Sequence, residues 1–509
     1  MCFLRNFPLF VGFLFLLSGP LFADSPVTPK SATYSREVLD ASMKVADALW
    51  DDRAGLLALP VAEHASGRNH RVRQTIWYAL GLFQRGGQGD DARAARAIEA
   101  VLTQQVDEPG AAWNGTFYRS TEEVQIPVTA IAWNEYDPNW RQFIGTSLAL
   151  ALVEFEARIP APLRARMLEA IVRAADGEQA QGRLKPSYTN IAVMHAFLCA
   201  FAGERCGRPD LAKIGANYVE EVYAGFKEHN SFEEFNSPTY YGVDFYGLAL
   251  WRAHGITPRM KALGAELEAA LWRDTADFYH AGLRNICGPF DRAYGMDMRR
   301  YVALTGLWVR LALPEEIAPF PPLGGEMDHA HDFFYAPCFT LLGARIPEDA
   351  LALFRKFHGE KLITRVLPRG RTATAWLSEN VMIGAESAAL SRGVIDDKNQ
   401  YQPATMHWRT PVDGIGWMRL VHAPRSDASA LAGTLTITGT GSYTFRVEAP
   451  GMTKNNFARD RWALPGLNVT IESDASGFSI SPGNGYIDAT YSEASHFTLR
   501  VESDLKPKH

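Results

Sequence analysis

Tyrosine, asparagine and aspartate side chains gather at the start of one apolar segment, in the stretch FEEFNSPTYYGVDFYGLALW (residues 232–251). Ser237 suits a helix N-cap, and Pro238 suits the first helical position, where its missing N–H costs nothing. The groups here that are able to exchange protons or bind a polar ligand are Asn236, Tyr240, Tyr241 and Asp244. Because apolar residues follow up to Trp251, we expect a buried helix whose N-terminus carries acid–base chemistry.

The first two thirds of the chain alternates between two kinds of segment. Five segments are apolar on nearly all sides, as expected for buried helices: residues 77–87, 146–157, 194–204, 245–255 and 301–313. Four are amphipathic, which is typical of surface helices: residues 91–104, 161–175, 210–226 and 258–280. This spacing is too long for short helical-hairpin repeats. With a further helix at residues 36–50, it predicts an α/α toroid of five or six helical hairpins.

Polar and aromatic residues precede each apolar segment. Those we single out are Arg73 before the first, Trp133, Trp140 and Arg141 around the start of the second, Tyr188 and Asn190 before the third, and Arg292, Tyr294 and Asp297 before the fifth. The inner helices of a toroid run in one direction, so we expect these residues to meet at one rim and line a ligand cleft. Aromatic faces stack on sugar rings, and Asn, Asp and Arg bind hydroxyls and carboxylates. The alternative is that they are ordinary helix caps and surface residues.

Two loops are candidates to border the same cleft. Residues 106–136 are rich in Trp, Tyr and Asn and are too long for a bare connector, which predicts a lid or wall at the cleft mouth. The loop GGEMDHAHDFFYAP (residues 324–337) contains His329 and His331, either of which is able to act as a general base. We expect no cofactor; the alternative is a divalent metal ion held by Glu326, Asp328, His329 and His331.

The last part of the chain changes character. Segments that alternate apolar and polar residues, separated by turn residues, occur at 380–386, 416–422, 433–440, 443–448, 467–473, 477–482, 486–491 and 496–503. This pattern predicts an antiparallel β-sandwich. The expected domains are therefore a toroid over residues 31–340 and a β-sandwich over residues 360–503, followed by a short tail.

Composition and the N-terminus limit the partners and the compartment. The 509 residues carry a net charge of −6, which argues against a nucleic-acid binder. Arg5, an apolar run at residues 7–17 and a cleavage site at Ala23 predict a signal peptide over residues 1–23. No later apolar run approaches the roughly 20 residues needed to span a membrane. We therefore expect a secreted or periplasmic protein with no membrane contact after signal removal; an uncleaved anchor is the alternative.

Four cysteines follow the expected cleavage site: Cys199, Cys206, Cys287 and Cys338. In an oxidising compartment they permit three disulfide connectivities, and the sequence does not choose among them. Cys199 lies in an apolar run, which is equally typical of a buried free thiol.

An α/α toroid followed by an antiparallel β-domain resembles the heparinase and alginate lyase type of polysaccharide lyase, and NSPTYYGV (residues 236–243) is similar to the Asn and Tyr elements of those enzymes. The resemblance implies an acidic polysaccharide or oligosaccharide as substrate and β-elimination at a uronate. In that reaction the C6 carboxylate is neutralised, a base removes the C5 proton, and an acid protonates the leaving oxygen.

The roles implied by this resemblance fall on the residues above. Asn190, Asn236 and Arg292 would neutralise the carboxylate. Tyr240 or Tyr241 would be the acid/base, with His329 or His331 as its partner and Arg292, Arg299 and Arg300 as cations that lower a tyrosine pKa. Substrate contacts would come from Arg73, Trp133, Trp140, Arg141, Tyr188, Tyr294 and Asp297.

Two other functions remain open. A glycoside hydrolase on the same fold needs two carboxyl groups flanking the bond, and the available ones are Glu233, Glu234, Asp244, Asp291 and Asp297. A noncatalytic glycan-binding protein needs the aromatic residues but not the ionisable groups. The sequence does not name the polysaccharide or the oligomeric state.

Overall fold

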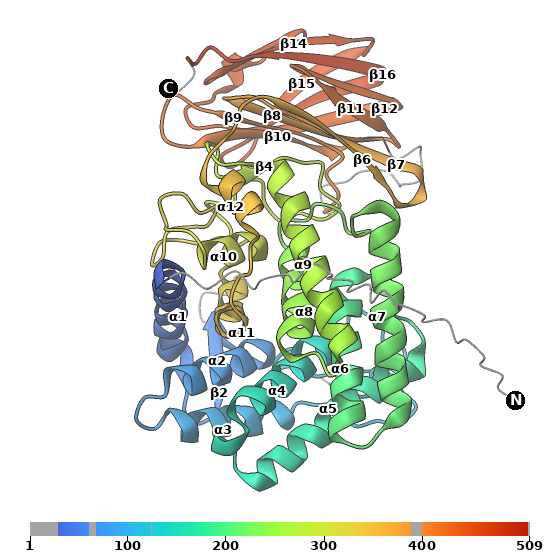
Figure 1. Ribbon diagram of the computed structural model, residues 1–509. Helices are drawn as coiled ribbons and strands as arrows, with labels where there is room; N and C mark the ends of the chain where they lie inside the picture. The colour runs from blue at the N-terminus through green and yellow to red at the C-terminus, as the bar shows by residue number, and fades with distance from the viewer. Residues whose placement is uncertain (1–28, 61–67, 124, 388–399, 507–509) are drawn as a thin grey trace, which may run out of the picture.

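The protein has a helical part and a β-sheet part, which lie one above the other in Figure 1. The computed structural model describes residues 29–60, 68–123, 125–387 and 400–506. The helices end with α12 (Glu348–Arg355), and the large sheet begins with β6 (Lys361–Leu367). The expected signal peptide, residues 1–23, lies outside the described residues.

Buried and surface helices alternate along the helical part. The buried helices are α2 (Val72–Arg85), α4 (Trp140–Phe155), α6 (Thr189–Arg205), α8 (Tyr240–His254) and the short α10 (Leu304–Arg310). The outer helices are α3 (Asp90–Leu102), α5 (Ala161–Gln181), α7 (Pro209–His229) and α9 (Pro258–Phe278). Each outer helix packs against the inner helix that precedes it, which gives four hairpins and confirms the predicted α/α toroid.

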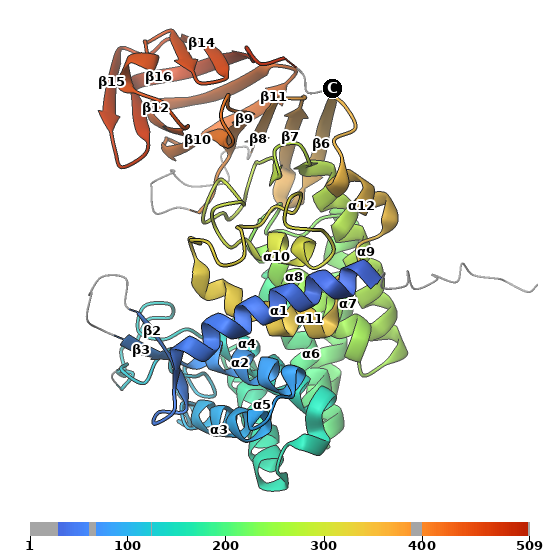
Figure 2. The ribbon, with the colours of Figure 1, turned by 90° about the vertical axis from the view of Figure 1, so that its left-hand side faces the viewer.

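The ring closes without further regular hairpins. Between α10 and α2 lie the 3₁₀ helix η2 (Ala330–Tyr335) and α11 (Ala336–Leu342), and α11 packs against α2 and α8. The N-terminal helix α1 (Pro29–Leu49) packs across α11, and Figure 2 shows it in front of that helix. The predicted five or six hairpins are therefore four regular hairpins and the less regular packing of α10, α11 and α1.

The long connection between α3 and α4 forms one wall of a cavity. It has a small core of its own, made by Val106, Trp113, Ile126 and Tyr136. A three-stranded sheet of β1 (Trp50–Asp51), β2 (Leu56–Pro60) and β3 (Arg68–Arg71) leads into α2, and Arg71 forms a β-bridge with Ser120 of the connection. Local packing thus fixes a segment that has almost no regular secondary structure.

The C-terminal part is one antiparallel sheet folded into a two-layer sandwich (Figures 1 and 2). The strand order is β13-β14-β16-β12-β10-β9-β8-β7-β6, with β11 on β12 and β15 on β16. The amide N–H of Ala430 in β11 donates to Oγ1 of Thr374 in β7 at 2.8 Å, which joins the two layers. The other strands of this sheet are β7 (Arg371–Leu377), β8 (Val381–Ser387), β9 (Ala404–Arg409), β10 (Ile415–His422), β11 (Asp427–Leu431), β12 (Thr434–Glu448), β13 (Arg461–Leu464), β14 (Leu467–Ser473), β15 (Gly477–Pro482) and β16 (Ile487–Glu502).

Two pairs of predicted strands are single strands in the structure. β12 (Thr434–Glu448) runs through the predicted break between residues 440 and 443, and β16 (Ile487–Glu502) runs through the break between residues 491 and 496. Register shifts in this pairing, on either side of Gly441, let the long strands bend without ending. The predicted strand ends at both places are therefore wrong; Gly439 and Gly441 in β12 mark a bend, not a turn.

An ion cluster ties the sheet to the segment that precedes α8. Arg371 of β7 contacts Asp291 at 2.8 Å and Glu386 at 3.3 Å, and its Nη2 donates to the carbonyl oxygen of Glu233 at 3.0 Å. Asp291 also accepts from the backbone N–H of Phe235 at 3.2 Å. The β-domain therefore fixes the loop that holds Glu233 and Glu234 and the neighbouring loop that holds Arg292.

The described cysteines form no disulfide. Cys199, Cys206, Cys287 and Cys338 are free thiols, and Cys199, Cys287 and Cys338 are buried. Among the described residues, no helix combines the length and the apolar character that a membrane crossing requires.

Candidate functional site

A cavity of about 670 Å³ lies where the N-termini of the inner helices meet. Its walls come from α2, α4, α6, α8 and α10, from the connection before α4, and from the loops at residues 292–294 and 331–335. Nine of the residues singled out in the sequence line it: Arg73, Trp133, Trp140, Tyr188, Asn190, Tyr240, Arg292, Tyr294 and His331. The prediction that the helix entrances share one cleft is confirmed.

Tyr240 stands at the first position of α8, where Ser237 accepts a hydrogen bond from its backbone N–H at 3.0 Å. Its hydroxyl lies 2.5 Å from the hydroxyl of Tyr294 and accepts a hydrogen bond from Nη2 of Arg292 at 2.7 Å. The Arg292 guanidinium also lies over the Tyr240 ring, 3.8 Å from its centroid. A hydroxyl with both a cation and a second hydroxyl on it is well placed to transfer a proton.

The pKa of Tyr240 does not follow the expectation from sequence. Burial and the neighbouring Tyr294 raise it, and the opposing effect of Arg292 is smaller. The other two expected cations are engaged elsewhere: Arg299 pairs with Asp413 at 3.4 Å, and Arg300 pairs with Glu448. Tyr240 is therefore a neutral phenol at neutral pH, the form that donates a proton.

Arg292 links three side chains around the cavity. Its Nη1 donates to Glu234 at 2.9 Å, its Nε donates to Gln400 at 2.9 Å, and its Nη2 donates to Tyr240. Asn190, at the start of α6, donates to the other oxygen of Glu234. Burial raises the pKa of Glu234, while Arg292 and Asn190 oppose that rise. Glu234 therefore orients the two groups that were expected to bind a carboxylate.

The opposite wall holds a cation among aromatic rings. The Arg73 guanidinium lies 5.0 Å from the ring centroid of Trp77, 5.1 Å from that of Trp140 and 4.9 Å from that of Phe143. Its nearest carboxylate, Asp332, is 3.9 Å away. This wall can stack on a sugar ring and attract an anionic group at the same place.

His331 lies beside this wall, 3.6 Å from Asp332. Although 47% of the side chain stays exposed, burial lowers the pKa of His331; Asp332 opposes this shift, and Arg73 adds to it. The imidazole is therefore mostly neutral at neutral pH and is able to accept a proton.

Trp133 projects at the mouth of the cavity. Its backbone has φ of 68°, a left-handed conformation that is uncommon for a residue other than glycine, and 54% of the residue is exposed. The Arg183 guanidinium lies 5.6 Å from its ring centroid. A large aromatic side chain held in solvent beside a cavity is suited to stacking on a ligand.

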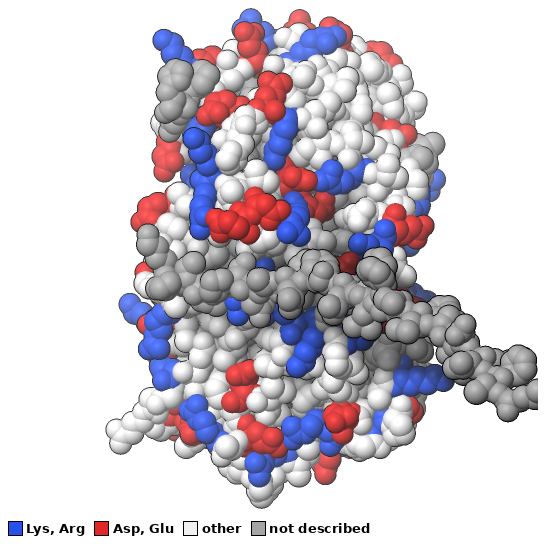
Figure 3. Space-filling model, in the orientation of Figure 1, with Lys and Arg blue, Asp and Glu red and all other residues white. Residues whose placement is uncertain are grey.

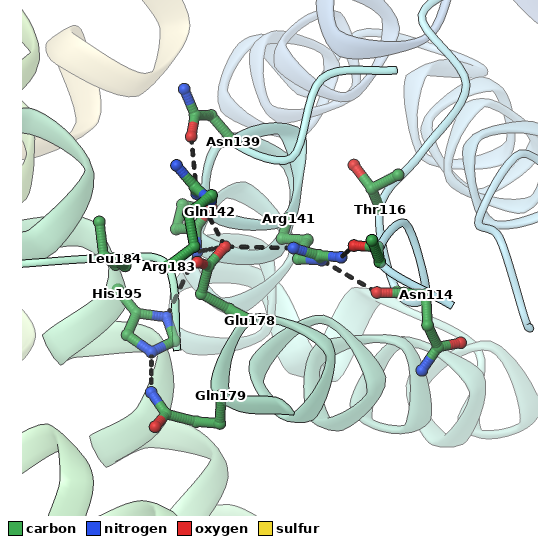
Figure 4. A network of polar contacts seen from close by, with 12 residues as sticks. Asn114, Thr116, Asn139, Arg141, Gln142, Glu178, Gln179, Arg183, Leu184 and His195 are labelled. Atoms are coloured by element: carbon green, nitrogen blue, oxygen red, sulfur yellow. Dashed lines mark hydrogen bonds and ion pairs between the residues drawn. The ribbon is translucent and has the colours of Figure 1, made fainter. Parts of the chain in front are cut away.

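A buried polar network, drawn in Figure 4, is joined to the cavity lining through Asn139. Asn139 donates to the hydroxyl of Tyr188 at 2.9 Å and accepts from Arg183 at 3.0 Å. Arg183 contacts Glu178 at 2.9 Å, and Glu178 contacts the fully buried Arg141 at 3.2 Å. The expectation that Arg141 binds substrate is wrong, because this side chain is inside the network and donates to the carbonyl oxygens of Ala112 and Asn114.

Three further predicted residues point away from the cavity. Tyr241 follows Tyr240 by one helical position but is buried, and its hydroxyl is 3.4 Å from that of Ser231. Asn236 donates to the carbonyl oxygens of Cys287 and Pro289 at 2.7 and 2.9 Å, so it fixes a loop. Asp244 is fully buried one turn further along α8, and burial raises its pKa well above the usual value. None of the three is in contact with the cavity, and their predicted catalytic roles are corrected accordingly.

His329 and Asp297 lie in neighbouring spaces. His329 stacks on Tyr294 with ring centroids 4.8 Å apart, on the side of a smaller cavity of about 360 Å³. Asp297 also lines that smaller cavity and accepts from the backbone N–H of Arg299 at 2.9 Å. Neither residue lines the cavity around Tyr240.

The predicted metal alternative does not form a cluster. Within the part of the chain that the structure describes, no group of three or more His, Cys, Asp and Glu side chains is arranged to hold a metal ion. Glu326 and Asp328 are exposed, and the backbone of Asp328 pairs with Tyr301. His329 and His331 face different spaces, so these four residues do not converge.

Several cavity residues were not chosen from the sequence. Asn139 and Asp137 directly precede α4, so their place at a helix entrance could have predicted from the sequence that they line the cavity. Burial raises the pKa of Asp137. Gln400 reaches Arg292 from the β-domain across more than a hundred residues, and no local pattern marks it. Figure 3 shows acidic and basic side chains interspersed over one face of the molecule.

Solved structures similar to this chain include enzymes of the type that the sequence resembles. Heparinase III is 12% identical, with a TM-score of 0.45 and coverage of 96% of this chain and 86% of that chain. Chondroitin AC lyase from Streptomyces coelicolor A3 is 10% identical, with a TM-score of 0.39 and coverage of 95% and 80%. An endoglucanase from Clostridium thermocellum is 10% identical, with a TM-score of 0.31 and coverage of 94% of each chain.

A comparison with curated proteins finds no match. Two family models match the chain, one for each part. The model described as Domain of unknown function (DUF8770) matches residues 365–497, within the β-domain. The model described as Domain of unknown function (DUF8769) matches residues 36–344, more than half of the chain and most of the toroid with its cavity, and the protein belongs to that family.

Proposed function

We propose that the protein cleaves a uronate-containing polysaccharide or oligosaccharide by β-elimination in the cavity around Tyr240. The observation that carries this proposal is the contact of Arg292 with the Tyr240 hydroxyl at 2.7 Å, inside a cavity that Asn190 also lines. A proton-transfer group and two donors for a carboxylate are thereby adjacent, which is the combination that β-elimination needs.

Arg292 and Asn190 are the groups that neutralise the uronate carboxylate in this proposal. A guanidinium has five N–H donors, and three of those of Arg292 are engaged by Glu234, Gln400 and Tyr240. The amide of Asn190 uses one of its two N–H donors on Glu234. The remaining donors can bind the carboxylate as negative charge grows on it, which acidifies the C5 proton.

The proton steps follow from the protonation states. His331, neutral at neutral pH, removes the C5 proton, and the electron pair of that bond forms the C4–C5 double bond. The C4–O bond breaks with its electrons on the leaving oxygen, which takes the proton of the neutral Tyr240 phenol. Tyr294 then returns a proton to Tyr240 through their 2.5 Å contact and is restored from solvent. The reaction needs no oxidant, reductant or cofactor.

Aromatic residues hold the sugars in this account. Trp140 and Arg73 form one wall, Tyr188 the floor near Asn190, and Trp133 the mouth. The signal-peptide pattern of residues 1–23 leads us to propose further that the protein is secreted or periplasmic, where a polymeric substrate is accessible.

Hydrolysis is the second candidate, and one observation favours it. None of Glu233, Glu234, Asp244, Asp291 and Asp297 lines the cavity, but Asp137 and Asp332 do. Burial raises the pKa of Asp137, as expected for the acid of a glycosidase. If Asp137 and Asp332 flank the bond, a glycoside hydrolase is the outcome instead.

The test is a screen of acidic glycans read by two assays. Alginate, hyaluronan, chondroitin sulfate and heparan sulfate are incubated with the protein, and both ultraviolet absorbance and new reducing ends are followed. Elimination produces equal amounts of unsaturated uronate and reducing ends. Reducing ends without absorbance would identify a hydrolase, and binding without either product would identify a noncatalytic glycan-binding protein.

A further inference from the structure

A second large space lies between the two domains. It has a volume of about 770 Å³ and is lined on the helical side by Arg284, Arg299 and Phe320, and on the sheet side by Trp417 and Tyr486. Trp417 is on β10, in the layer of the sandwich that faces the helices in Figure 1. We call this space the interdomain groove.

The interdomain groove and the cavity around Tyr240 are separated by one smaller cavity. The smaller cavity behind Tyr294 shares Tyr294 with the Tyr240 cavity, and it shares Asp297, Arg300, Trp417 and Glu448 with the groove. The three spaces therefore lie in a row, with Tyr294 and His329 between the Tyr240 hydroxyl and Trp417. A ligand longer than the Tyr240 cavity would extend along this row.

Two guanidinium groups, those of Arg284 and Arg299, line this groove. Arg284 is fixed by carbonyl oxygens, with bonds of 2.9 Å to Ala318 and 2.7 Å to Glu315. Arg299 has Asp297 at 3.6 Å and the fully exposed Asp413 at 3.4 Å, and its Nε has no hydrogen bond. Burial and the charge of Arg299 lower the pKa of Arg284, while Asp297 and Asp413 oppose this shift, so the two cations repel each other in part. An anionic group between them would relieve that repulsion.

Aromatic faces accompany these cations. Trp417 and Tyr486 are both partly exposed, and one face of the Tyr486 ring is covered by the Arg446 guanidinium at 3.9 Å. Arg446 in turn pairs with Asp488 at 2.8 Å, so the ring is held in place. Aromatic faces alternating with guanidinium groups suit a chain of sugar rings that carries carboxylates or sulfates.

We propose that the interdomain groove binds the part of an acidic polysaccharide that extends from the sugar at Tyr240, so that the protein acts within long chains. This inference rests on the proposed function, because it extends the same substrate beyond the reacting sugar. Trp417 provides a stacking platform, and Arg284 and Arg299 together bind one anionic group of the chain. Substrates too short to reach Trp417 do not use the groove.

The test compares long and short substrates of one glycan with Trp417→Ala. The polymer that the screen identifies is used beside its purified tetrasaccharide, and the initial rate of bond cleavage is measured by reducing ends, which lyase and hydrolase chemistry both produce. We expect KM for the polymer to rise about 10-fold, because one sugar of the chain loses the aromatic face on which it stacks. The rate on the tetrasaccharide should stay within about 2-fold of wild type. An unchanged KM for the polymer, or an equal loss on both substrates, would overturn the proposal.

Two variants separate binding from damage to the fold. Trp417→Phe keeps an aromatic face and should recover most of the affinity for polymer. Trp50→Ala removes a partly buried tryptophan that does not line the groove, and it should leave the polymer KM unchanged. The unfolding temperature of Trp417→Ala should lie within a few degrees of the wild-type value, which would confirm that the fold is retained.

A binding measurement distinguishes failure of this inference from failure of the proposed function. Affinity electrophoresis in gels containing alginate, hyaluronan, chondroitin sulfate or heparan sulfate needs no catalysis. If wild type is retarded in one gel and Trp417→Ala is not, the groove binds polymer whatever reaction occurs. If each glycan that retards wild type retards Trp417→Ala equally, the groove is not a binding site. If no gel retards wild type and no glycan is cleaved, the groove proposal fails with the proposed function.

Discussion

Arg292 holds the Tyr240 hydroxyl at 2.7 Å and covers the ring of the same tyrosine at 3.8 Å. The two residues are 52 positions apart and come from different segments of the toroid. Their contact places a fixed positive charge beside a neutral phenol. In the proposed β-elimination, the cation of this pair binds the substrate carboxylate, and the phenol gives up the proton.

Adjacent tyrosines provide the first prediction. Tyr240→Phe should lower kcat by roughly 10²–10⁴-fold, because it removes the proton donor and leaves the ring in place. Substrate affinity should stay within a few-fold of wild type, as measured by affinity electrophoresis. Tyr241→Phe is the matched control: its hydroxyl lies away from the cavity, 3.4 Å from that of Ser231 and beside Asp274, so activity should be retained while stability falls by about 1–3 kcal/mol. Full activity of Tyr240→Phe would contradict the assignment.

Replacement of the cation provides the second prediction. Arg292→Lys keeps the charge but cannot donate to Glu234, Gln400 and Tyr240 together in a planar array. We expect kcat/KM to fall by about 100-fold or more, as for loss of one preorganised donor to a developing charge. Gln400→Ala removes one of these contacts without removing the guanidinium and should reduce kcat/KM far less. Steady-state kinetics on one substrate compares the two, and equal losses would show that Arg292 acts only as a structural link.

The buried network of Figure 4 provides the third prediction. Glu178→Gln leaves Arg141 charged and without a counter-ion in the interior, and breaking such a pair costs about 3–5 kcal/mol. Chemical denaturation should show this loss. Glu169→Gln, at an exposed position on the same helix, is the control and should change the free energy of unfolding by less than about 0.5 kcal/mol. A similar small effect for Glu178→Gln would mean that the network does not stabilise the fold.

Buried histidines provide the fourth prediction, on pH. Burial lowers the pKa of His407 to about 4, from the usual value of 6.5. The unfolded chain therefore binds a proton that the folded chain does not between pH 6.5 and pH 4, so the free energy of unfolding falls as the pH falls through this range. One such group contributes a slope of up to about 1.4 kcal/mol per pH unit.

The variant His407→Gln isolates this group, since every other titrating residue is shared with wild type. His407 Nε2 donates to the carbonyl oxygen of Met296 at 3.0 Å, and glutamine is also a donor. Between pH 6.5 and pH 4 the stability of the variant should decline less steeply than that of wild type. Parallel declines would show that His407 titrates alike in the folded and unfolded chains.

The sequence predicted the helices of the toroid well because each inner helix is apolar on nearly all sides. Residues 245–255, for example, lie almost entirely within α8. The sheet was less predictable. Gly439 and Gly441 lie in the middle of β12, where a bend in a long strand has the same local composition as a turn between two short ones.

The site was predictable only as a set of helix entrances. Tyr240 and Tyr241 are chemically identical and differ by about 100° around the helix, and only packing decides which one faces the cavity. Asn236 has the residue type of a carboxylate binder, but two carbonyl oxygens engage its amide. Gln400 contacts Arg292 across the domain boundary. Such roles depend on contacts between distant segments, which local patterns do not contain.

Elimination and hydrolysis differ in whether water enters the product, so the most direct measurement is mass spectrometry of the products formed in water enriched with heavy oxygen. A cleaved acidic oligosaccharide of known structure should give one fragment lighter by one water molecule, with a double bond at the new non-reducing end. At early times, the cleavage should incorporate no heavy oxygen into either fragment. If neither fragment is lighter by one water molecule and one heavy oxygen is incorporated per bond cleaved, the result contradicts β-elimination at Tyr240 and Arg292.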